Sequence, residues 1–276
     1  TAAEYDRIQG LTIYGSEGND FIDVSNISPI SPSDHFSIEI FAKGGSDHIR
    51  GSGFSDLIVA GDGTDTVEAG AGNDFIFADS MAQNSGSESP YCLCPDLVHG
   101  GSGDDMIRGG GGSDMLFGDA GDDWLSGGQD SDRLSGGSGN DVLIGDWISL
   151  SGGPMDVGDG DDEIHGDAGH DMIVGGLGAN LLDGGQGVDE VVAVVYTTDV
   201  TLSDTRLVDL QSHDMENIER VDLRLNLHAE TGSGVLIDAR SFSGDTTLTG
   251  GRGPDTLLGS RGRDVINGKA GNDVLH

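Results

Sequence analysis

Aspartates at a constant nine-residue spacing are the residues of this chain best placed to do chemistry. They occupy the sixth position of a unit with the pattern G-G-x-G-x-D-x-U-x, in which U is aliphatic. The unit occurs 17 times, with Asp at the sixth position in 16 copies and Asn180 in the other. Its fourth position is Gly except at Phe54 and Asp130. Carboxylates repeated in this way indicate a series of cation sites rather than one acid/base pair.

The spacing of these aspartates follows from the structure that the unit predicts. Glycines permit tight turns, and the x-U-x triplet forms a short strand with its middle side chain on one face. Two units make an 18-residue coil, and stacked coils bury the aliphatic residues that one strand cannot bury alone. The units lie in blocks at 15–23, 42–77, 100–144, 157–192 and 250–276.

Stacking places each residue over the one 18 positions later. Asp105, Asp123 and Asp141 are therefore expected in one column, and Asp114 and Asp132 in the opposite one. Carboxylates about 5 Å apart repel each other strongly, so a cation is expected between successive turns. Asp and backbone carbonyl oxygens suit calcium, whereas zinc prefers His and Cys.

These units carry a resemblance to a known family. The runs at 100–108 (GGSGDDMIR) and 136–144 (GGSGNDVLI) resemble the RTX, or haemolysin-type calcium-binding, repeat. The resemblance implies an all-β fold, a right-handed parallel β-roll or β-helix solenoid of stacked 18-residue coils with calcium at both edges. It also implies a protein exported from a Gram-negative-type bacterium, usually by type I secretion.

The resemblance also implies the metal ligands, which in this family are the position-six carboxylates and alternate turn carbonyls. The best-supported carboxylates are those of Asp105, Asp114, Asp123, Asp132 and Asp141. The others are Asp20, Asp47, Asp56, Asp65, Asp74, Asp162, Asp171, Asp189, Asp255, Asp264 and Asp273. The turn ligands carried over are Gly100, Ser102, Gly109, Gly111, Gly118, Ala120, Gly121 and Gly139.

The number of calcium ions is predicted from the pairs of aspartates 18 residues apart. Seven such pairs lie inside blocks, and Asp162/Asn180 forms an eighth, weakened pair. About seven or more ions are expected, with further sites at block edges. The departures at Phe54 and Asn180 put the full affinity of the adjacent sites in doubt.

The segments between blocks are interpreted as irregular coils of one continuous solenoid over residues 1–276. The segment 24–41 is expected to form one coil, 78–99 a coil plus four residues, and 145–156 a nonapeptide plus three. The segment 193–249 is expected to form three coils with a small loop. About fifteen coils would give a rod of roughly 70 Å. An alternative makes 193–249 a small inserted domain with a short helix near 213–219.

Composition excludes several partners. The formal charge of −36 disfavours nucleic acid and anionic membrane surfaces, and no apolar run is long enough for a membrane span. A chain with 14 aromatic residues and this charge should stay unfolded unless its charge is neutralised. Cys92 and Cys94 are too few for a disulfide scaffold or a zinc site, which leaves two free thiols or one tight bridge.

The function predicted is that of a secreted, calcium-binding structural module, of adhesin or matrix type, with polysaccharide or a cell surface as a possible partner. One alternative is the non-catalytic repeat region of a secreted protease, lipase or alginate-epimerase-like enzyme. Another is a polysaccharide-acting β-helix enzyme. H-E-x-x-H and G-x-S-x-G are absent from this sequence. The dipeptides Asp34-His35 and His213-Asp214 are interpreted as surface polar groups, and Trp124 as a packing residue.

Overall fold

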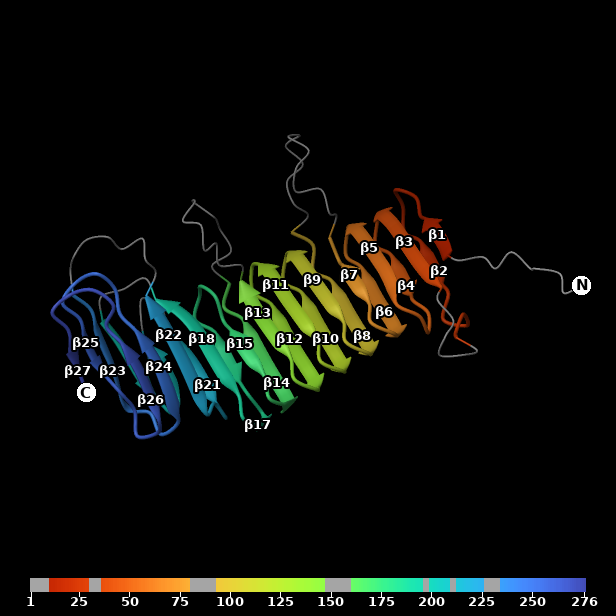
Figure 1. Cartoon of the computed structure of the whole chain (residues 1–276). Helices are drawn as coiled ribbons and strands as arrows, with labels where there is room; N and C mark the ends of the chain where they lie inside the picture. The colour runs from red at the N-terminus through yellow and green to blue at the C-terminus, as the bar shows by residue number, and fades with distance from the viewer. Residues whose placement is uncertain are drawn as a thin grey trace, which may run out of the picture.

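The fold is an elongated stack of β-strands. A computed structural model of the chain describes residues 10–29, 36–79, 93–146, 160–195, 199–208, 212–225 and 234–276. These residues form 27 strands and no helix, so they contain no helical segment able to cross a bilayer. Figure 1 shows the strands succeeding one another from one end of the molecule to the other, with β1 and β27 at opposite ends.

The strands belong to two sheets, named A and B here. Sheet A contains, in spatial order, β1 (Gly10–Tyr14), β3 (Ser37–Gly44), β5 (Asp56–Asp62), β7 (Phe75–Phe77), β9 (Met106–Gly111), β11 (Trp124–Gln129), β13 (Val142–Asp146), β15 (Met172–Val174), β18 (Glu190–Val195), β22 (Arg220–Leu225), β24 (Asp245–Thr249) and β26 (Asp264–Asn267). Sheet B contains β2 (Phe21–Asp23), β4 (His48–Arg50), β6 (Thr66–Ala71), β8 (Leu97–Ser102), β10 (Met115–Ala120), β12 (Arg133–Ser138), β14 (Glu163–Gly169), β16 (Leu181–Asp183), β21 (Ser212–Glu216), β20 (Arg206–Val208), β19 (Asp199–Ser203), β23 (Leu236–Ser241), β25 (Thr256–Leu258) and β27 (Val274–Leu275), with β17 (Gln186–Gly187) beside β14.

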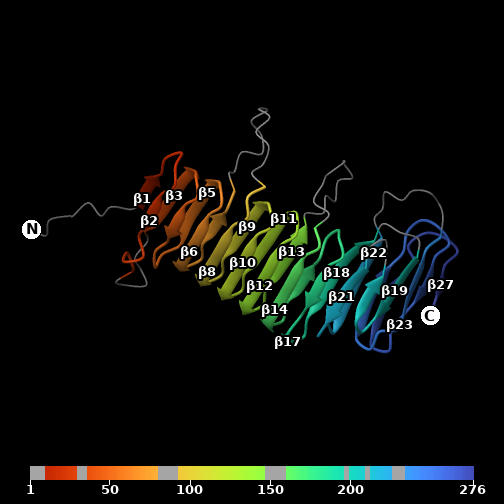
Figure 2. The ribbon, with the colours of Figure 1, turned by 180° about the vertical axis from the view of Figure 1, so that it is seen from behind.

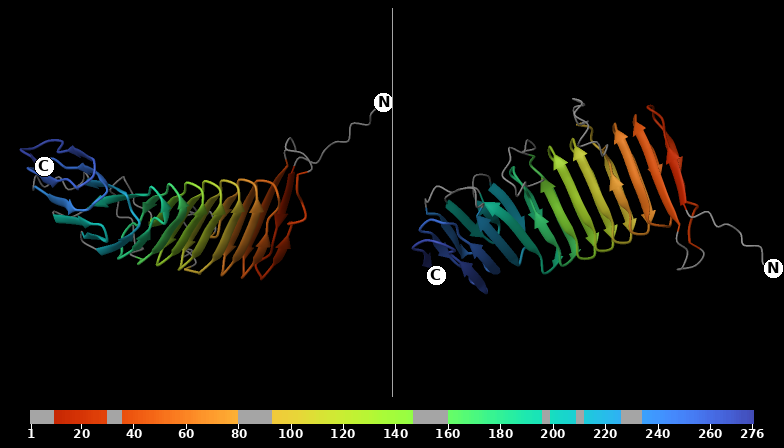
Figure 3. Two further views of the ribbon diagram at one scale, coloured as in Figure 1. Left: turned by 90° about the horizontal axis from the view of Figure 1, so that it is seen from below. Right: turned by 45° about the horizontal axis from the view of Figure 1, so that its top comes forward.

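The chain alternates between the two sheets, and this alternation produces coils. Neighbouring strands within a sheet are parallel and, inside the repeat blocks, are offset by 18 residues, as in the pairing of Leu116 with Leu134. Figures 2 and 3 show the two sheets lying back to back, joined by tight turns along both edges. The predicted all-β parallel solenoid is confirmed.

The core is a ladder of aliphatic side chains from the eighth position of each unit. Ile107, Leu125 and Leu143 on sheet A and Leu116 and Leu134 on sheet B are fully buried. Parallel stacking aligns each with the same position of the next coil, so every coil supplies two rungs of one continuous core. Leu275, in the last strand of sheet B, is 46% exposed.

The interruptions between blocks are insertions rather than complete coils. Asp20 pairs directly with Asp47, 27 residues on, so 24–41 is one half-coil with nine extra residues and not the whole coil predicted. Asp65 pairs with Asp96, 31 residues on. The segment 78–99 therefore contains a nonapeptide plus 13 extra residues, and the prediction of a coil plus four is wrong.

The interruption at 145–156 adds no nonapeptide. Asp132 pairs with Asp162, 30 residues on, which is one coil plus 12 residues. Because these insertions lengthen coils instead of adding them, sheet A has twelve strands among the described residues, and not the fifteen coils expected. Twelve strands about 4.8 Å apart span roughly 55 Å.

Sheet B changes direction in the segment 193–249. Strands β21 and β20 pair antiparallel, as do β20 and β19, before β19 pairs parallel with β23. Sheet A continues in parallel through β22 and β24, which gives two coils where three were expected. The helix considered near 213–219 is wrong, because Ser212–Glu216 is a strand whose Met215 is buried in the core.

Close approach between successive turns makes a glycine necessary at the fourth position in the middle of the stack. Gly121 has φ +138°, and a Cβ atom there would collide with the carbonyl oxygen of Gly103 in the preceding coil. Gly18 has the same position in the first turn, but its Cβ would meet only Ser16 Oγ, at 3.9 Å. The close approach of the preceding coil and the positive φ together make glycine essential at 121, and neither applies at Gly18.

We predict that Gly121→Ala destabilises the protein by about 1–3 kcal/mol, the usual cost of a non-glycine residue held in a strained conformation. Gly18→Ala, the matched control, should cost less than about 0.5 kcal/mol. Urea unfolding in saturating calcium measures both. Equal effects of the two substitutions would contradict the stacked-turn geometry.

Candidate metal centres

The position-six aspartates form two columns, one along each edge of the stack. The first column, at the turns that lead into sheet A, contains Asp56, Asp74, Asp105, Asp123, Asp141, Asp171 and Asp189. The second column, at the turns that lead into sheet B, contains Asp20, Asp47, Asp65, Asp96, Asp114, Asp132 and Asp162. Both columns cross block boundaries, so interrupted blocks still share one row of carboxylates.

One oxygen of each stacked aspartate holds the neighbouring coil. The backbone N–H of Asp105 donates to Asp123 Oδ1 at 2.7 Å, and that of Asp123 donates to Asp141 Oδ1 at 2.8 Å. The same bond recurs in the second column, where Asp114 N–H donates to Asp132 Oδ1 at 2.9 Å. It persists beside Phe54, because Asp56 N–H still donates to Asp74 Oδ1 at 2.8 Å.

The other oxygen of these aspartates is buried without a hydrogen-bond partner. Asp105 and Asp123 are only 3% and 2% exposed, and Oδ2 of each is among these unpaired atoms. The full set is Oδ2 of Asp47, Asp65, Asp74, Asp96, Asp105, Asp114, Asp123, Asp132, Asp141, Asp162, Asp171 and Asp189. A buried carboxylate oxygen without a partner is energetically costly, so these oxygens need a ligand or a proton.

The pKa values of these aspartates reflect the cost of burying a carboxylate. Burial, followed by the charges of neighbouring aspartates, raises the pKa of Asp74 and Asp96 to about 8. Burial raises the pKa of Asp132 to about 9, with further contributions from Asp114 and Asp162. Burial likewise raises the pKa to about 8 for Asp114, to about 7 for Asp123, Asp162 and Asp171, and to about 6 for Asp65, Asp105 and Asp141. Without a counter-charge, the folded state therefore favours the neutral acids.

Turn carbonyl oxygens lie beside the same carboxylates. A Cβ atom on Gly166 would lie 2.5 Å from both Asp171 Oδ2 and the carbonyl oxygen of Gly184 in the next coil. The carbonyls of Ser102 and Ala120 each accept one N–H from the preceding coil, at 2.7 and 2.8 Å, which leaves each oxygen a second lone pair. Carboxylate and carbonyl oxygens thus converge at each turn.

The donor set fits calcium. No three His, Cys, Asp or Glu side chains in the described part of the chain cluster as a metal site, so an ion here would need backbone oxygens as well as two carboxylates. Calcium accepts six to eight oxygen ligands in flexible geometry, which matches carboxylates and carbonyls contributed by two successive turns. The buried, unpaired Oδ2 atoms would supply the negative charge of such sites.

Two acidic residues of these columns, Asp96 and Glu219, were not among the predicted ligands. Asp96 is 3% exposed and pairs with both Asp65 and Asp114, and its signal was the short run Asp96-Leu97-Val98-His99 before the next block. Glu219 ends the first column, where Oε2 accepts the Asp189 N–H at 3.0 Å. No spacing rule identifies Glu219, because it lies 30 residues after Asp189.

The second column ends in two residues that are not acidic. Asn180 Oδ1 accepts the Asp162 N–H at 2.8 Å, and its Nδ2 donates to the Leu177 carbonyl at 3.0 Å. His213 follows, with Nδ1 3.5 Å from the Asn180 nitrogen. His213 is 5% exposed, so its interpretation as a surface group is wrong. Asp34 and His35 lie outside the described residues.

The C-terminal aspartates are placed differently. Asp255 N–H donates to Asp273 Oδ1 at 3.0 Å, so these two form a separate pair. Asp264 belongs to no column and instead accepts the hydroxyl of Thr246 at 2.7 Å. The residues predicted as carboxylate ligands therefore form two columns and one isolated pair, with Asp264 apart from all of them.

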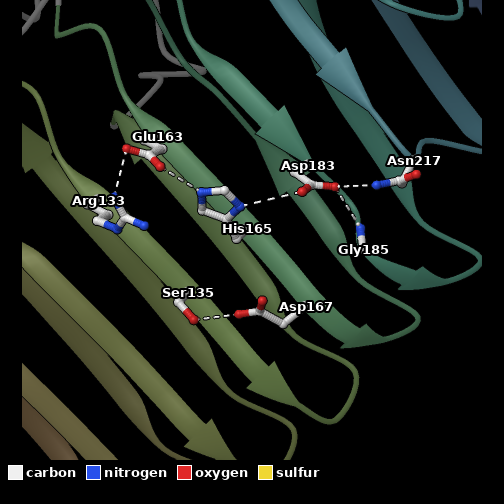
Figure 4. A network of polar contacts seen from close by, with 8 residues as sticks. All are labelled: Arg133, Ser135, Glu163, His165, Asp167, Asp183, Gly185 and Asn217. Atoms are coloured by element: carbon white, nitrogen blue, oxygen red, sulfur yellow. Dashed lines mark hydrogen bonds and ion pairs between the residues drawn. The ribbon is translucent and has the colours of Figure 1, made fainter.

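A polar network covers part of the outer face of sheet B (Figure 4). His165 Nε2 lies 2.9 Å from Glu163 Oε1, and His165 Nδ1 lies 3.6 Å from Asp183 Oδ2. Arg133 extends the network through Glu163 Oε2 at 3.0 Å. Most of these contacts join neighbouring strands, which is the cross-strand pairing that stabilises sheets.

Trp124 and Cys94 are both among the residues that the structure describes. Trp124 is partly buried on the outer face of sheet A, where it pairs in register with Met106 and Val142. Cys94 is disulfide-bonded, while Cys92 lies outside the described residues.

Comparison with known proteins identifies the repeat. The family model of the RTX calcium-binding nonapeptide repeat matches residues 12–26, 41–76, 95–125, 117–147, 156–191 and 241–275, more than half of the chain. A search of curated proteins gave no match. Among solved structures, the chain is similar to a hyperactive, Ca²⁺-dependent, β-helical antifreeze protein from an Antarctic bacterium. Identity is 17%, coverage is 94% of this chain and 84% of the other, and the TM-score is 0.38.

The raised pKa values predict that acid stabilises the calcium-free fold. Between the unfolded Asp pKa near 3.8 and the folded values of about 6 to 9, the folded state binds more protons than the unfolded state. This stabilisation is complete below pH 3.8 and is lost as the pH rises through about 6 to 9. Circular dichroism of protein stripped of calcium on a chelating resin should therefore show more β-structure at pH 5.5 than at pH 8.5. A flat or inverted dependence would show that these carboxyls are not buried.

Proposed function

Because the chain belongs to the RTX calcium-binding nonapeptide-repeat family, we propose that it is a structural module whose two aspartate columns bind calcium and thereby stabilise the fold. The observation that carries this proposal is the row of buried, unpaired Oδ2 atoms on each edge. When bound, calcium supplies positive charge and coordination to these oxygens. The residues that would hold it are the column aspartates and the turn carbonyls that converge on them.

The pairs of stacked aspartates support a larger number of ions than sequence spacing alone suggests. Each column contains six such pairs among the described residues, and Asp255/Asp273 adds one more. Thirteen divalent ions would bring 26 positive charges to a chain of formal charge −36. Charge neutralisation on this scale would make calcium a requirement for folding.

The organisation of the module supports one folding unit over residues 1–276. Sheet A continues without a break in hydrogen bonding from β1 to β26, and no described part of the chain pairs outside the two sheets. Cooperative stacking suits a protein that is exported unfolded and folds outside the cell, where calcium is plentiful.

A role in an adhesin or extracellular matrix is the finer part of the proposal. The outer face of sheet A presents a row of apolar side chains from successive coils, including Leu57, Phe75, Met106 and Met172. The ions would lie at the edges, so both outer faces remain available for contacts with polysaccharide or a cell surface. Pull-down of the calcium-loaded protein on insoluble polysaccharides tests this part, and no retention on any would argue against it.

We predict that calcium removal unfolds the protein at pH 7.5. Without the ions the columns repel, and the aliphatic ladder alone does not offset the ordering entropy of the chain. Circular dichroism during calcium titration should show a cooperative gain of β-structure, and magnesium at equal concentration should not reproduce it. A full β-signal with cooperative melting after chelation would contradict the proposal.

A second prediction separates the two roles of the column carboxylates. Asn180 shows that Asn keeps the ladder hydrogen bond and finds an internal partner for its second polar atom. Asp123→Asn should therefore raise the calcium midpoint by about two-fold or more while stabilising the calcium-free form. Asp20→Asn is the control, because Asp20 ends its column and its Oδ2 already accepts the Ser16 N–H at 2.6 Å. Equal midpoints for the two variants would exclude a calcium-binding role for Asp123.

A further inference from the structure

Two of the insertions interrupt the same kind of turn at the same place. Both lie in turns that lead from sheet A to sheet B, after β7 and after β13. In each, the last residue described before the insertion is an aspartate at the second position of the unit, Asp79 or Asp146. The residues 80–92 and 147–159 themselves lie outside the described part of the chain.

In uninterrupted turns, the second position presents its backbone carbonyl to the next coil. The Ser52 carbonyl accepts the N–H of Ala71, at the third position of the next such turn, at 3.0 Å. Aspartates at the second position of uninterrupted turns on the opposite edge, which lead into sheet A, direct their side chains outwards. Asp119, with φ +72°, contacts His99, and Asp167, with φ +69°, contacts Ser135 (Figure 4).

Asp79 and Asp146 have the opposite arrangement. Neither has a positive φ, and each directs its carboxylate at the next coil. Asp79 Oδ2 accepts the Gly111 N–H at 2.8 Å, and Asp146 Oδ2 accepts the Leu177 N–H at 3.0 Å. Gly111 and Leu177 are third-position residues, so the carboxylate accepts the bond that a turn carbonyl accepts elsewhere. In these two turns the side chain is therefore the acceptor in place of a backbone carbonyl.

Other buried carboxylate oxygens without a hydrogen-bond partner lie in the coils beside Asp79. Asp79 Oδ1 is buried without a hydrogen-bond partner, as are Oδ2 of Asp96 and of Asp114, whose residues are 3% and 2% exposed. Cβ atoms on the adjacent Gly109 and Gly110 would collide with the carboxylates of Asp114 and Asp79 respectively. After burial, Asp79 also contributes to the raised pKa of Asp114. Asp79 therefore brings a third carboxylate to these two coils, beside the turn that carries Asp114.

Asp146 lies where the second column loses a charge. A Cβ atom on Gly175 would lie 2.7 Å from Asn180 Nδ2, and one on the adjacent Gly176 would lie 2.5 Å from Asp146 Cβ. Asp162, the coil partner of Asn180, has a buried and unpaired Oδ2. Asp162 and Asp146 together carry the two negative charges that a regular Asp/Asp pair provides.

We propose that Asp79 and Asp146 are calcium ligands that stand in for turn carbonyls at the two insertions, and that Asp146 supplies the charge that Asn180 lacks. The inference rests on the proposed calcium-binding function and assigns two side chains outside the position-six pattern. It makes the Asp162/Asn180 coil a complete calcium site, and it gives the Asp96/Asp114 coil one negative charge more than a regular site.

The test compares full-length variants in which the hydrogen-bond acceptor is retained. D79N and D146N remove charge from the proposed sites, whereas D119N and D167N remove it from outward-facing second-position aspartates. Equilibrium dialysis with calcium measures the number and affinity of bound ions, and thermal melting at fixed calcium gives an independent readout. D79N and D146N should each weaken one site by about ten-fold or more, because affinity follows ligand charge. D119N and D167N should match the unmodified chain.

A compensating variant makes the assignment of Asp146 specific. Adding N180D to D146N returns the second charge to the same coil and should restore the lost site, also where D146N alone fails to fold. Ion binding by D146N equal to that of D167N would overturn the inference, as would failure of N180D to restore it. Absence of calcium binding by the unmodified chain would instead overturn the proposed function itself.

Discussion

Burial of carboxylates in rows is the constraint on which the rest of this structure depends. Every column aspartate after the first uses one oxygen to accept the N–H of the preceding coil, and its other oxygen lies buried in the turn. The resulting cost appears as pKa values raised to between about 6 and 9. Protons or divalent cations relieve this cost, and the donors present favour calcium. Stacking and ion binding are thus two consequences of one hydrogen-bonding arrangement.

The architecture separates its tasks by position. The column carboxylates lie at the edges, and the aliphatic side chain of each strand lies in the interior. Side chains on the two outer faces belong neither to the columns nor to the core. Both faces expose apolar side chains, such as Phe75 on sheet A and Met115 on sheet B, and sheet B also carries charged cross-strand pairs such as Arg133–Glu163. Changes on a face need not disturb the ion columns, because face and edge residues come from different positions of the unit.

The ladder hydrogen bonds also explain how the fold accommodates insertions. A coil can lengthen at a turn without displacing its strands, because the strand register is set by the ladder hydrogen bonds on both sides. At two insertions, Asp79 and Asp146 supply side-chain acceptors for an N–H that a turn carbonyl accepts elsewhere. In the segment 193–249 the columns end at Glu219 and His213. Sheet B becomes antiparallel there, whereas sheet A stays parallel through β22 and β24.

The sequence by itself determined the unit, the parallel coil, the aliphatic ladder and the partners of each aspartate inside a block. These follow from local rules, since nine residues return the chain to the other sheet and 18 return it to the same one. Tertiary structure decided which aspartates meet across the interruptions. Insertions of 9, 13 and 12 residues separate Asp20 from Asp47, Asp65 from Asp96 and Asp132 from Asp162 beyond one coil. Spacing cannot distinguish an inserted loop from an inserted coil, because only backbone hydrogen bonding fixes where the chain re-enters the stack. The column positions of Asp96, Glu219 and buried His213 were not predicted for the same reason. Their roles depend on the adjacent coil rather than on their neighbours in sequence.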